Sequence, residues 1–169
     1  MKRVALIIPD AGPLISLGKA KSLDILLKLE LPIYIIDQVY FEVTREIIET
    51  QVGRLARMER EINPSARQRQ LGDAAITDFL TNQVNEFVES SQPVLLLFED
   101  SDLIRMNVVL RENVHMLSTK ALLIGMERLG LITSEVNVWE NIIAAGRIPS
   151  NEIVDQSAPA VLGGSYWQP

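Results

Sequence analysis

Two short runs of apolar residues constrain the fold of this chain more than any other feature. Val4–Ile8 and Val94–Phe98 contain only apolar residues, and an acid follows each run within two positions. A strand with one face in water alternates apolar and polar residues, whereas a continuous apolar strand is buried on both faces, as in a parallel sheet. The two runs therefore predict central strands of a parallel sheet with helices on both faces.

The rest of the chain alternates between strand-like and helix-like segments. Shorter strands are expected at 33–36 and 114–117, and one or two short helices after a turn at Gly12-Pro13. The other expected helices cover residues 38–50, 73–88, 103–110, 119–129 and 136–145. This order is typical of an α/β fold with a mostly parallel central sheet.

Asp37 is expected to cap the helix over 38–50, with Val39, Val43 and Ile47 on its buried side. Residues 1–149 are expected to form one domain. A C-terminal tail over 150–169 would be either loose or docked on a partner through Tyr166 and Trp167.

The absence of cysteine narrows the chemistry that a site could use. With no cysteine and only one histidine, His115, the chain cannot form disulfides, thiolate zinc sites or sites with several histidines. A bound metal ion would need oxygen ligands from Asp and Glu. We expect His115 to be structural, since it falls in a short strand and the sequence shows no acidic or nucleophilic partner.

The charge balance argues against a broad nucleic-acid surface. The chain has 16 basic and 22 acidic residues, for a net charge of -6. Phosphate binding usually relies on a basic surface, but carboxylates that bind divalent ions have their local charge reversed by those ions. The first apolar run stops at Pro9, too early for a signal peptide, and no stretch is long enough to span a membrane, so we expect a cytoplasmic protein.

Four acids from separate segments are the candidate site residues. Asp10 and Asp100 follow the two apolar strands, Asp73 lies in the first turn of an expected helix, and Glu42 lies one turn into another. Sites in open α/β sheets lie beyond the carboxyl ends of the strands, so these acids could converge on one cleft. Each also has a structural alternative, as a cap, as a partner of a helix dipole or as part of a solvated surface.

Four stretches resemble the motifs of PIN-domain nucleases. Ile8–Leu17 resembles the opening of these domains, in which an acid at a strand end precedes a small residue and an apolar helix. Ile36–Val43 is similar to their second motif, and Leu71–Ile76 to their Gly-acid-Ala-Ala step. Leu96–Arg105 resembles the strand-end Asp with an Arg five positions on. The resemblance covers roughly residues 4–132.

The resemblance implies a PIN-like fold and a set of acidic residues that act together. The implied catalytic and metal-binding residues are Asp10, Glu42, Asp73 and Asp100. Asp73 stands where that branch of the family usually has Glu. Asp100 is preferred over its neighbours Glu99 and Asp102 as the strand-end acid, because Asp102 would begin the next helix.

The activity that the resemblance implies is hydrolysis of phosphodiester bonds in RNA. Carboxylate oxygens suit Mg²⁺ or Mn²⁺ as the cofactor. Single-stranded regions are the expected substrate, because a carboxylate cleft reaches an exposed phosphodiester more easily there than in an A-form helix. The first expectation is a VapC-like toxin ribonuclease of a bacterial toxin–antitoxin pair, with an antitoxin protein and a second copy of the chain as partners. The alternatives are a housekeeping RNA-processing nuclease and a PIN-like binding module that has lost catalysis. A haloacid dehalogenase would need a second Asp where Gly12 stands, and a receiver domain would need a strand-end lysine, whereas Lys120 falls in an expected helix.

A polar stretch over 51–70 carries the candidate nucleic-acid contacts. Its five arginines are Arg54, Arg57, Arg60, Arg67 and Arg69. They form either an arm that grips RNA or a solvated helix in which Glu59 and Glu61 are their partners. Thr119, at an expected helix start, could orient a ligand or phosphate, or cap the helix.

Overall fold

The structure of the chain is a computed structural model. It describes residues 4–39, 47–48, 55, 58, 62–63, 71–99 and 111–156.

Three parallel strands form the centre of the fold. They are β1 (Leu6–Pro9), β4 (Val94–Phe98) and β5 (Val114–Ser118), in the order β1-β4-β5. All residues of β1 and β4 are buried, as two-sided burial in a parallel sheet requires. The predicted α/β class and parallel sheet are therefore confirmed, although the sheet is small.

A second pair of parallel strands lies on the other side of β1. Here β2 (Ile35–Ile36) pairs with β3 (Ile47–Ile48). Just before β2, Ile33 forms a parallel bridge with Ile7, and the Tyr34 amide donates to the Ile7 carbonyl over 2.9 Å. In chain order, β2 and β3 therefore come first, on one side of β1, and β4 and β5 follow on its other side. In open α/β sheets, ligands bind beyond the carboxyl ends of the strands, at the point where the strand order reverses in this way.

The helix predicted over 38–50 is wrong at its C-terminal end. Ile47 and Ile48 form β3 and align with Ile35 and Ile36 of β2. Branching at Cβ makes consecutive isoleucines better suited to a strand than to a helix, and the neighbouring strand supplies the hydrogen bonds. Residues 40–46, which hold Val43, lie outside the described part.

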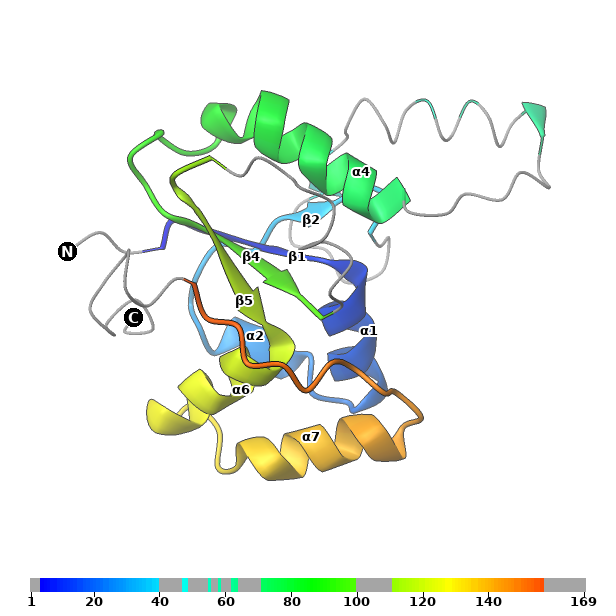
Figure 1. The fold of residues 1–169 in the computed structure, drawn as a ribbon, viewed down its shortest axis with the longest axis vertical. Helices are drawn as coiled ribbons and strands as arrows, with labels where there is room; N and C mark the ends of the chain where they lie inside the picture. Colours follow the sequence, from blue (N-terminus) through cyan, green and yellow to red (C-terminus); the bar gives the residue numbers. More distant parts are fainter. Residues whose placement is uncertain are drawn as a thin grey trace.

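The helices lie on both sides of the sheet. They are α1 (Ala11–Lys19), α2 (Asp24–Leu27), α4 (Leu71–Asp78), α6 (Thr119–Arg128) and α7 (Glu135–Ala144). Figure 1 shows α4 on one side of the strands and α6 and α7 on the other. A π-helical turn at Phe79–Gln83 and a short 3₁₀ turn at Val84–Glu86 continue α4. The helices predicted near 73–88, 119–129 and 136–145 are confirmed, whereas that over 103–110 lies outside the described residues.

Gly12 and Pro13 do not form the predicted turn. They lie in the first turn of α1, which begins directly after Asp10. Proline fits there because the amides of the first helical turn have no partner within the helix. The short loop between β1 and α1 therefore holds Asp10 close to the end of its strand.

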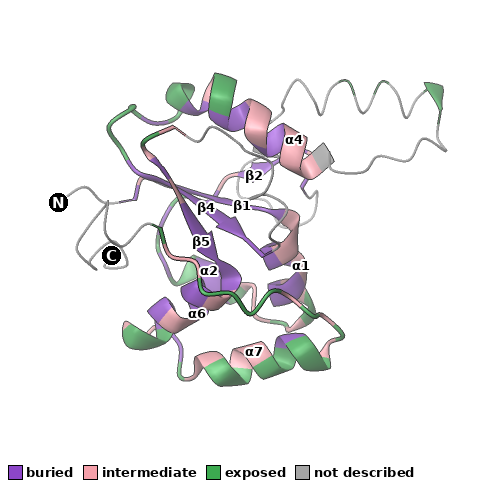
Figure 2. Ribbon diagram, viewed as in Figure 1, coloured by how far each residue is buried: buried purple, intermediate pink, exposed green. Residues whose placement is uncertain are grey.

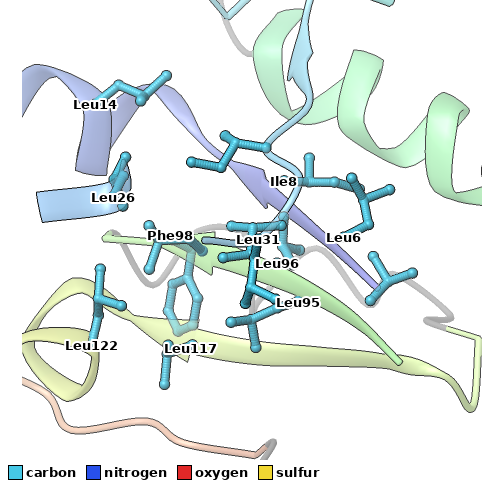
Figure 3. Packing of buried hydrophobic residues seen from close by; sticks show 14 of the residues in the cluster. Leu6, Ile8, Leu14, Leu26, Leu31, Leu95, Leu96, Phe98, Leu117 and Leu122 are labelled. Atoms are coloured by element: carbon cyan, nitrogen blue, oxygen red, sulfur yellow. The ribbon is translucent and has the colours of Figure 1, made fainter. Parts of the chain in front are cut away.

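The core fills the space between the sheet and the helices. Figure 2 shows the strands buried along their length, while α7 exposes its outer side. In Figure 3, Leu6, Ile8 and Leu96 pack together near the middle of the sheet. Among the residues that the structure describes, Phe79 from the π-helical turn is the largest fully buried side chain. Within the described part of the chain, no helix is both long and apolar enough to cross a membrane.

The beginning of the predicted C-terminal tail packs against the sheet. Asp155 forms an antiparallel bridge with Leu117 of β5, and the Gln156 amide donates to the Met116 carbonyl over 3.0 Å. The Ser118 hydroxyl accepts from the amides of Ala121 and Val154, so it caps α6 and holds the tail at once. Residues 157–169, including Tyr166 and Trp167, lie outside the described part.

Candidate active site

The buried polar side chains of the described residues gather at one edge of the sheet. Each of them ends a strand, closely follows one, or reaches the end of one from α1. These residues are Asp10, Ser16, Asp37, Glu99, Ser118 and Thr119. Buried polar and charged groups cost stability unless they are well partnered, so their concentration at the carboxyl ends of parallel strands indicates a site.

Asp10 lies at the end of β1, where the strand order reverses. Its amide donates to the Leu97 carbonyl of β4 over 2.8 Å, which fixes its backbone between the two strands. Although Asp10 is the N-cap residue of α1, its side chain makes no capping hydrogen bond. The carboxylate therefore does not cap α1, although a cap at Gly12 was the structural alternative for this residue.

The Asp10 carboxylate faces the N-terminal turn of α4. A Cβ placed on Gly72 would lie 3.9 Å from its Oδ1, which is an ordinary packing distance, so the carboxylate lies directly beside the helix. Asp73, the next residue, is partly exposed in the same turn. The fold thus brings the segments of Asp10 and Asp73 close together, and their predicted role in one metal site stays a prediction.

Asp73 also lies where a helix dipole favours a negative charge. It is the acidic residue in the first turn of α4, and its carbonyl accepts from the Thr77 hydroxyl over 2.8 Å. This position suits a helix-stabilising role as well as a role as a ligand. The structure is compatible with both roles, so the metal-ligand role and the helix-stabilising role of Asp73 both stay predictions.

Glu99 follows β4 and belongs to a buried polar network. Its Oε2 accepts from the Ser16 hydroxyl over 2.8 Å and from Nη2 of Arg147 over 2.6 Å. Nε of Arg147 donates to the Ser16 hydroxyl over 3.0 Å, which closes a triangle of contacts. With its charge balanced by an arginine, Glu99 is better suited to a structural role than to replacing Asp100 as a metal ligand.

Asp37 is a buried acid at the carboxyl end of β2. Its Oδ1 accepts from the Gln38 amide over 2.9 Å, and the Val39 amide donates to the Ile36 carbonyl, so residues 37–39 form a turn. The capping role predicted for Asp37 depended on the helix over 38–50, which β3 replaces at its end. Asp37 is therefore a further strand-end acid at the same edge.

Thr119 does not cap α6. Ser118 is the N-cap residue, and its hydroxyl accepts from the Ala121 amide. The buried Thr119 hydroxyl instead donates to the Phe98 carbonyl at the end of β4, over 3.4 Å. Thr119 thus ties the ends of β4 and β5 together behind the candidate site.

Several predicted site residues lie outside the described part. These are Glu42, Asp100, Asp102, Arg54, Arg57, Arg60, Arg67 and Arg69. Within the arginine-rich stretch 51–70, the structure describes Leu55, Met58 and Ile62 as helical, and all three are exposed. Among the described side chains, no three acids or histidines are close enough to hold a metal ion. A metal site at Asp10 and Asp73 would therefore need the residues that the structure does not describe.

His115 lies on β5, opposite Leu95 of β4, and is partly buried. Burial disfavours the charged imidazolium and lowers the pKa of His115 below its usual 6.5. The unfolded chain then binds the proton more readily than the folded chain does. The contribution of His115 to stability is therefore fully present above its usual pKa, and it is lost as the pH falls towards its lowered pKa in the folded protein.

His115→Gln should therefore reduce the loss of stability on mild acidification. We expect its unfolding free energy to fall less than that of the wild type from about pH 7.5 to about pH 5.5, as measured by urea denaturation at each pH. Two parallel pH curves would contradict this expectation. If His115 is only structural, the variant also keeps its full catalytic activity.

The sequence did not predict three residues that lie at this edge, which are Ser16, Asp37 and Arg147. Ser16 and Arg147 carried no local signal, because their partner Glu99 is remote from both in the chain. Asp37 did carry such a signal, since it follows the apolar run 33–36 as Asp10 follows the first run.

No protein-family model matches this chain, and comparisons with curated proteins and with solved structures gave no match either.

Proposed function

We propose that this protein is a metal-dependent nuclease of the PIN kind, which hydrolyses phosphodiester bonds in single-stranded regions of RNA. One observation supports this proposal most: the Asp10 carboxylate lies where the strand order reverses and faces the turn of α4 that carries Asp73. A buried acid that does not cap its own helix, at the edge where α/β folds place their sites, favours a functional role.

The donor atoms suit a hard divalent ion. The chain has no cysteine, and the acids at this edge offer carboxylate oxygens, which Mg²⁺ and Mn²⁺ prefer. When bound, such an ion lowers the pKa of a water molecule and offsets the charge that develops on the phosphate. Asp10 and Asp73 would hold it together with the proposed ligands Glu42 and Asp100.

The chain's own residues would place the substrate. The hydrogen bond from the Asp10 amide to β4 holds its backbone at the sheet edge, and Asp73 is partly exposed in the turn of α4 that this carboxylate faces. The phosphates of an unpaired strand can approach such an edge individually, whereas those of an A-form duplex border a deep and narrow groove. We propose Arg54, Arg57, Arg60, Arg67 and Arg69 as the contacts to the RNA backbone.

The biological role that we propose is that of a toxin held in check by an antitoxin, with the enzyme acting as a homodimer. An acidic protein of net charge -6 suits a basic antitoxin segment that enters the site, since complementary charge speeds association. A small reading frame beside the gene, whose product binds this protein and stops cleavage, is the test of that role.

The substrate class is tested by comparing three end-labelled nucleic acids of one sequence: single-stranded RNA, the same RNA in a duplex, and single-stranded DNA. With Mn²⁺ we expect cleavage of the single-stranded RNA, and at least about tenfold slower cleavage of the duplex. Equal rates on single-stranded and duplex RNA would contradict the proposed substrate. Binding of RNA without cleavage of any strand would instead favour a binding module.

A further inference from the structure

Arg147 reaches the sheet edge from the far end of the chain. The α7 helix ends at Ala144, and Gly146 follows in a left-handed conformation with φ of 82°. The Gly146 amide donates to the Ile143 carbonyl and the Arg147 amide to the Ile142 carbonyl, which closes the helix end and reverses the chain. Glycine is the residue that adopts this conformation without strain, so the turn gives Arg147 a defined direction.

The guanidinium of Arg147 joins two elements of the site. Its Nη2 donates to Glu99, which follows β4, and its Nε donates to Ser16, which lies on α1. The planar fork of an arginine can bind two acceptors at once, which a lysine cannot do with the same geometry. Arg147 thus fastens α1 to the end of β4.

The first turn of α1 rests directly on Glu99. A Cβ on Gly12 would lie 2.8 Å from the Glu99 Cβ, so the helix backbone and the Glu99 side chain are in close contact. Asp10 directly precedes this turn, two residues before Gly12, and its amide donates to the Leu97 carbonyl of β4. The position of Glu99 therefore determines the position of the first turn of α1, and with it the position of Asp10 directly before that turn.

We propose that Arg147 is a positioning residue for the metal-binding carboxylate of Asp10, a role that rests on the proposed function. Glu99 is buried, and its Oε1 has no hydrogen-bond partner among the described residues, so Ser16 and Arg147 provide all of the described hydrogen bonds of its carboxylate. Without the arginine, a buried carboxylate has no cation and is driven towards water. Glu99 would then shift, and the first turn of α1 with Asp10 would shift with it.

The test compares Arg147→Met with Lys120→Met, which breaks another partly buried ion pair. Lys120 binds Glu135 over 2.7 Å and lies over the Trp139 ring, so these contacts join α6 to α7 rather than α1 to β4. Both variants should be less stable than the wild type. Only Arg147→Met should weaken Mn²⁺ binding in calorimetric titration, by about tenfold or more, as is typical for residues that orient a metal ligand.

A second readout does not depend on metal. Hydrogen exchange of the peptide spanning residues 10–18 should speed up in metal-free Arg147→Met and stay unchanged in Lys120→Met. Arg147→Lys keeps the charge beside Glu99 but cannot span Glu99 and Ser16 in the same way. It should recover most of the lost stability and only part of the Mn²⁺ affinity.

Two outcomes are kept apart by including Asp10→Asn in the titration. If Asp10→Asn loses Mn²⁺ binding while Arg147→Met binds Mn²⁺ as the wild type does, the positioning role is overturned and the proposed function stands. If the wild type binds no Mn²⁺, the proposed function is overturned, and the positioning role with it. Equal exchange at 10–18 in the two methionine variants would also overturn the positioning role.

Discussion

Asp10→Asn should abolish RNA cleavage while the protein stays folded. The substitution keeps the shape of the side chain and removes its charge, so the close approach to Gly72 is preserved. Residues that merely support a metal ligand contribute roughly 10- to 100-fold, so loss of a ligand should lower the cleavage rate by at least about a hundredfold. Clustered carboxylates repel one another without metal, so the metal-free variant should melt at the temperature of the wild type or above it.

Asp24→Asn is the matched control for this variant. Asp24 is an exposed acid on α2 whose carboxylate lies 3.9 Å from Nζ of Lys28. An exposed ion pair of this kind contributes about 1 kcal/mol or less, so cleavage and stability should both stay close to the wild type. If Asp10→Asn unfolds the protein, or cleaves as fast as Asp24→Asn does, then Asp10 is structural.

Gly12→Ala should destabilise the protein, although alanine is the better helix former. Its Cβ would lie 2.8 Å from the Glu99 Cβ, a backbone-anchored atom that cannot rotate away. Forcing an extra methyl group into a packed site costs about 1–3 kcal/mol. We expect a loss of that size in the free energy of unfolding, measured by urea denaturation.

Gly18→Ala, in the same helix, separates this contact from helix propensity. A Cβ on Gly18 would meet the Leu23 Cδ1 at 3.5 Å, which is an ordinary packing distance. Here alanine should stabilise the protein by up to about 1 kcal/mol, because it restricts the unfolded chain more than glycine does. Equal effects of the two substitutions would mean that Glu99 does not support the first turn of α1.

The sequence predicted the elements that have a strong local pattern. The runs at Val4–Ile8 and Val94–Phe98 became central parallel strands, because a strand without polar residues can only lie between two covered faces. The pattern failed at Ile47–Ile48, where apolar spacing that also suits a helix gave way to pairing with β2. A choice between helix and strand in so short a segment depends on the neighbour that it meets.

The candidate site could be predicted only where the chain order itself carries the signal. Asp10 was found because strand ends are visible in the sequence, and Asp37 could have been found in the same way. Arg147 could not, since it is 131 residues from Ser16, and nothing local distinguishes an arginine that folds back from one in solvent. Long-range polar contacts of this kind are fixed by packing, which a local pattern does not describe.

The dependence of RNA cleavage on Mn²⁺ tests the central claim most directly. Wild-type protein and Asp10→Asn, purified in the same way, would be incubated with a single-stranded RNA in Mn²⁺, in EDTA, and in EDTA followed by excess Mn²⁺. We predict cleavage by the wild type in Mn²⁺, none in EDTA, and recovery when Mn²⁺ is restored, with none by Asp10→Asn in any condition. Cleavage that persists in EDTA, or that Asp10→Asn shows as strongly as the wild type, would contradict a metal-dependent nuclease built around Asp10.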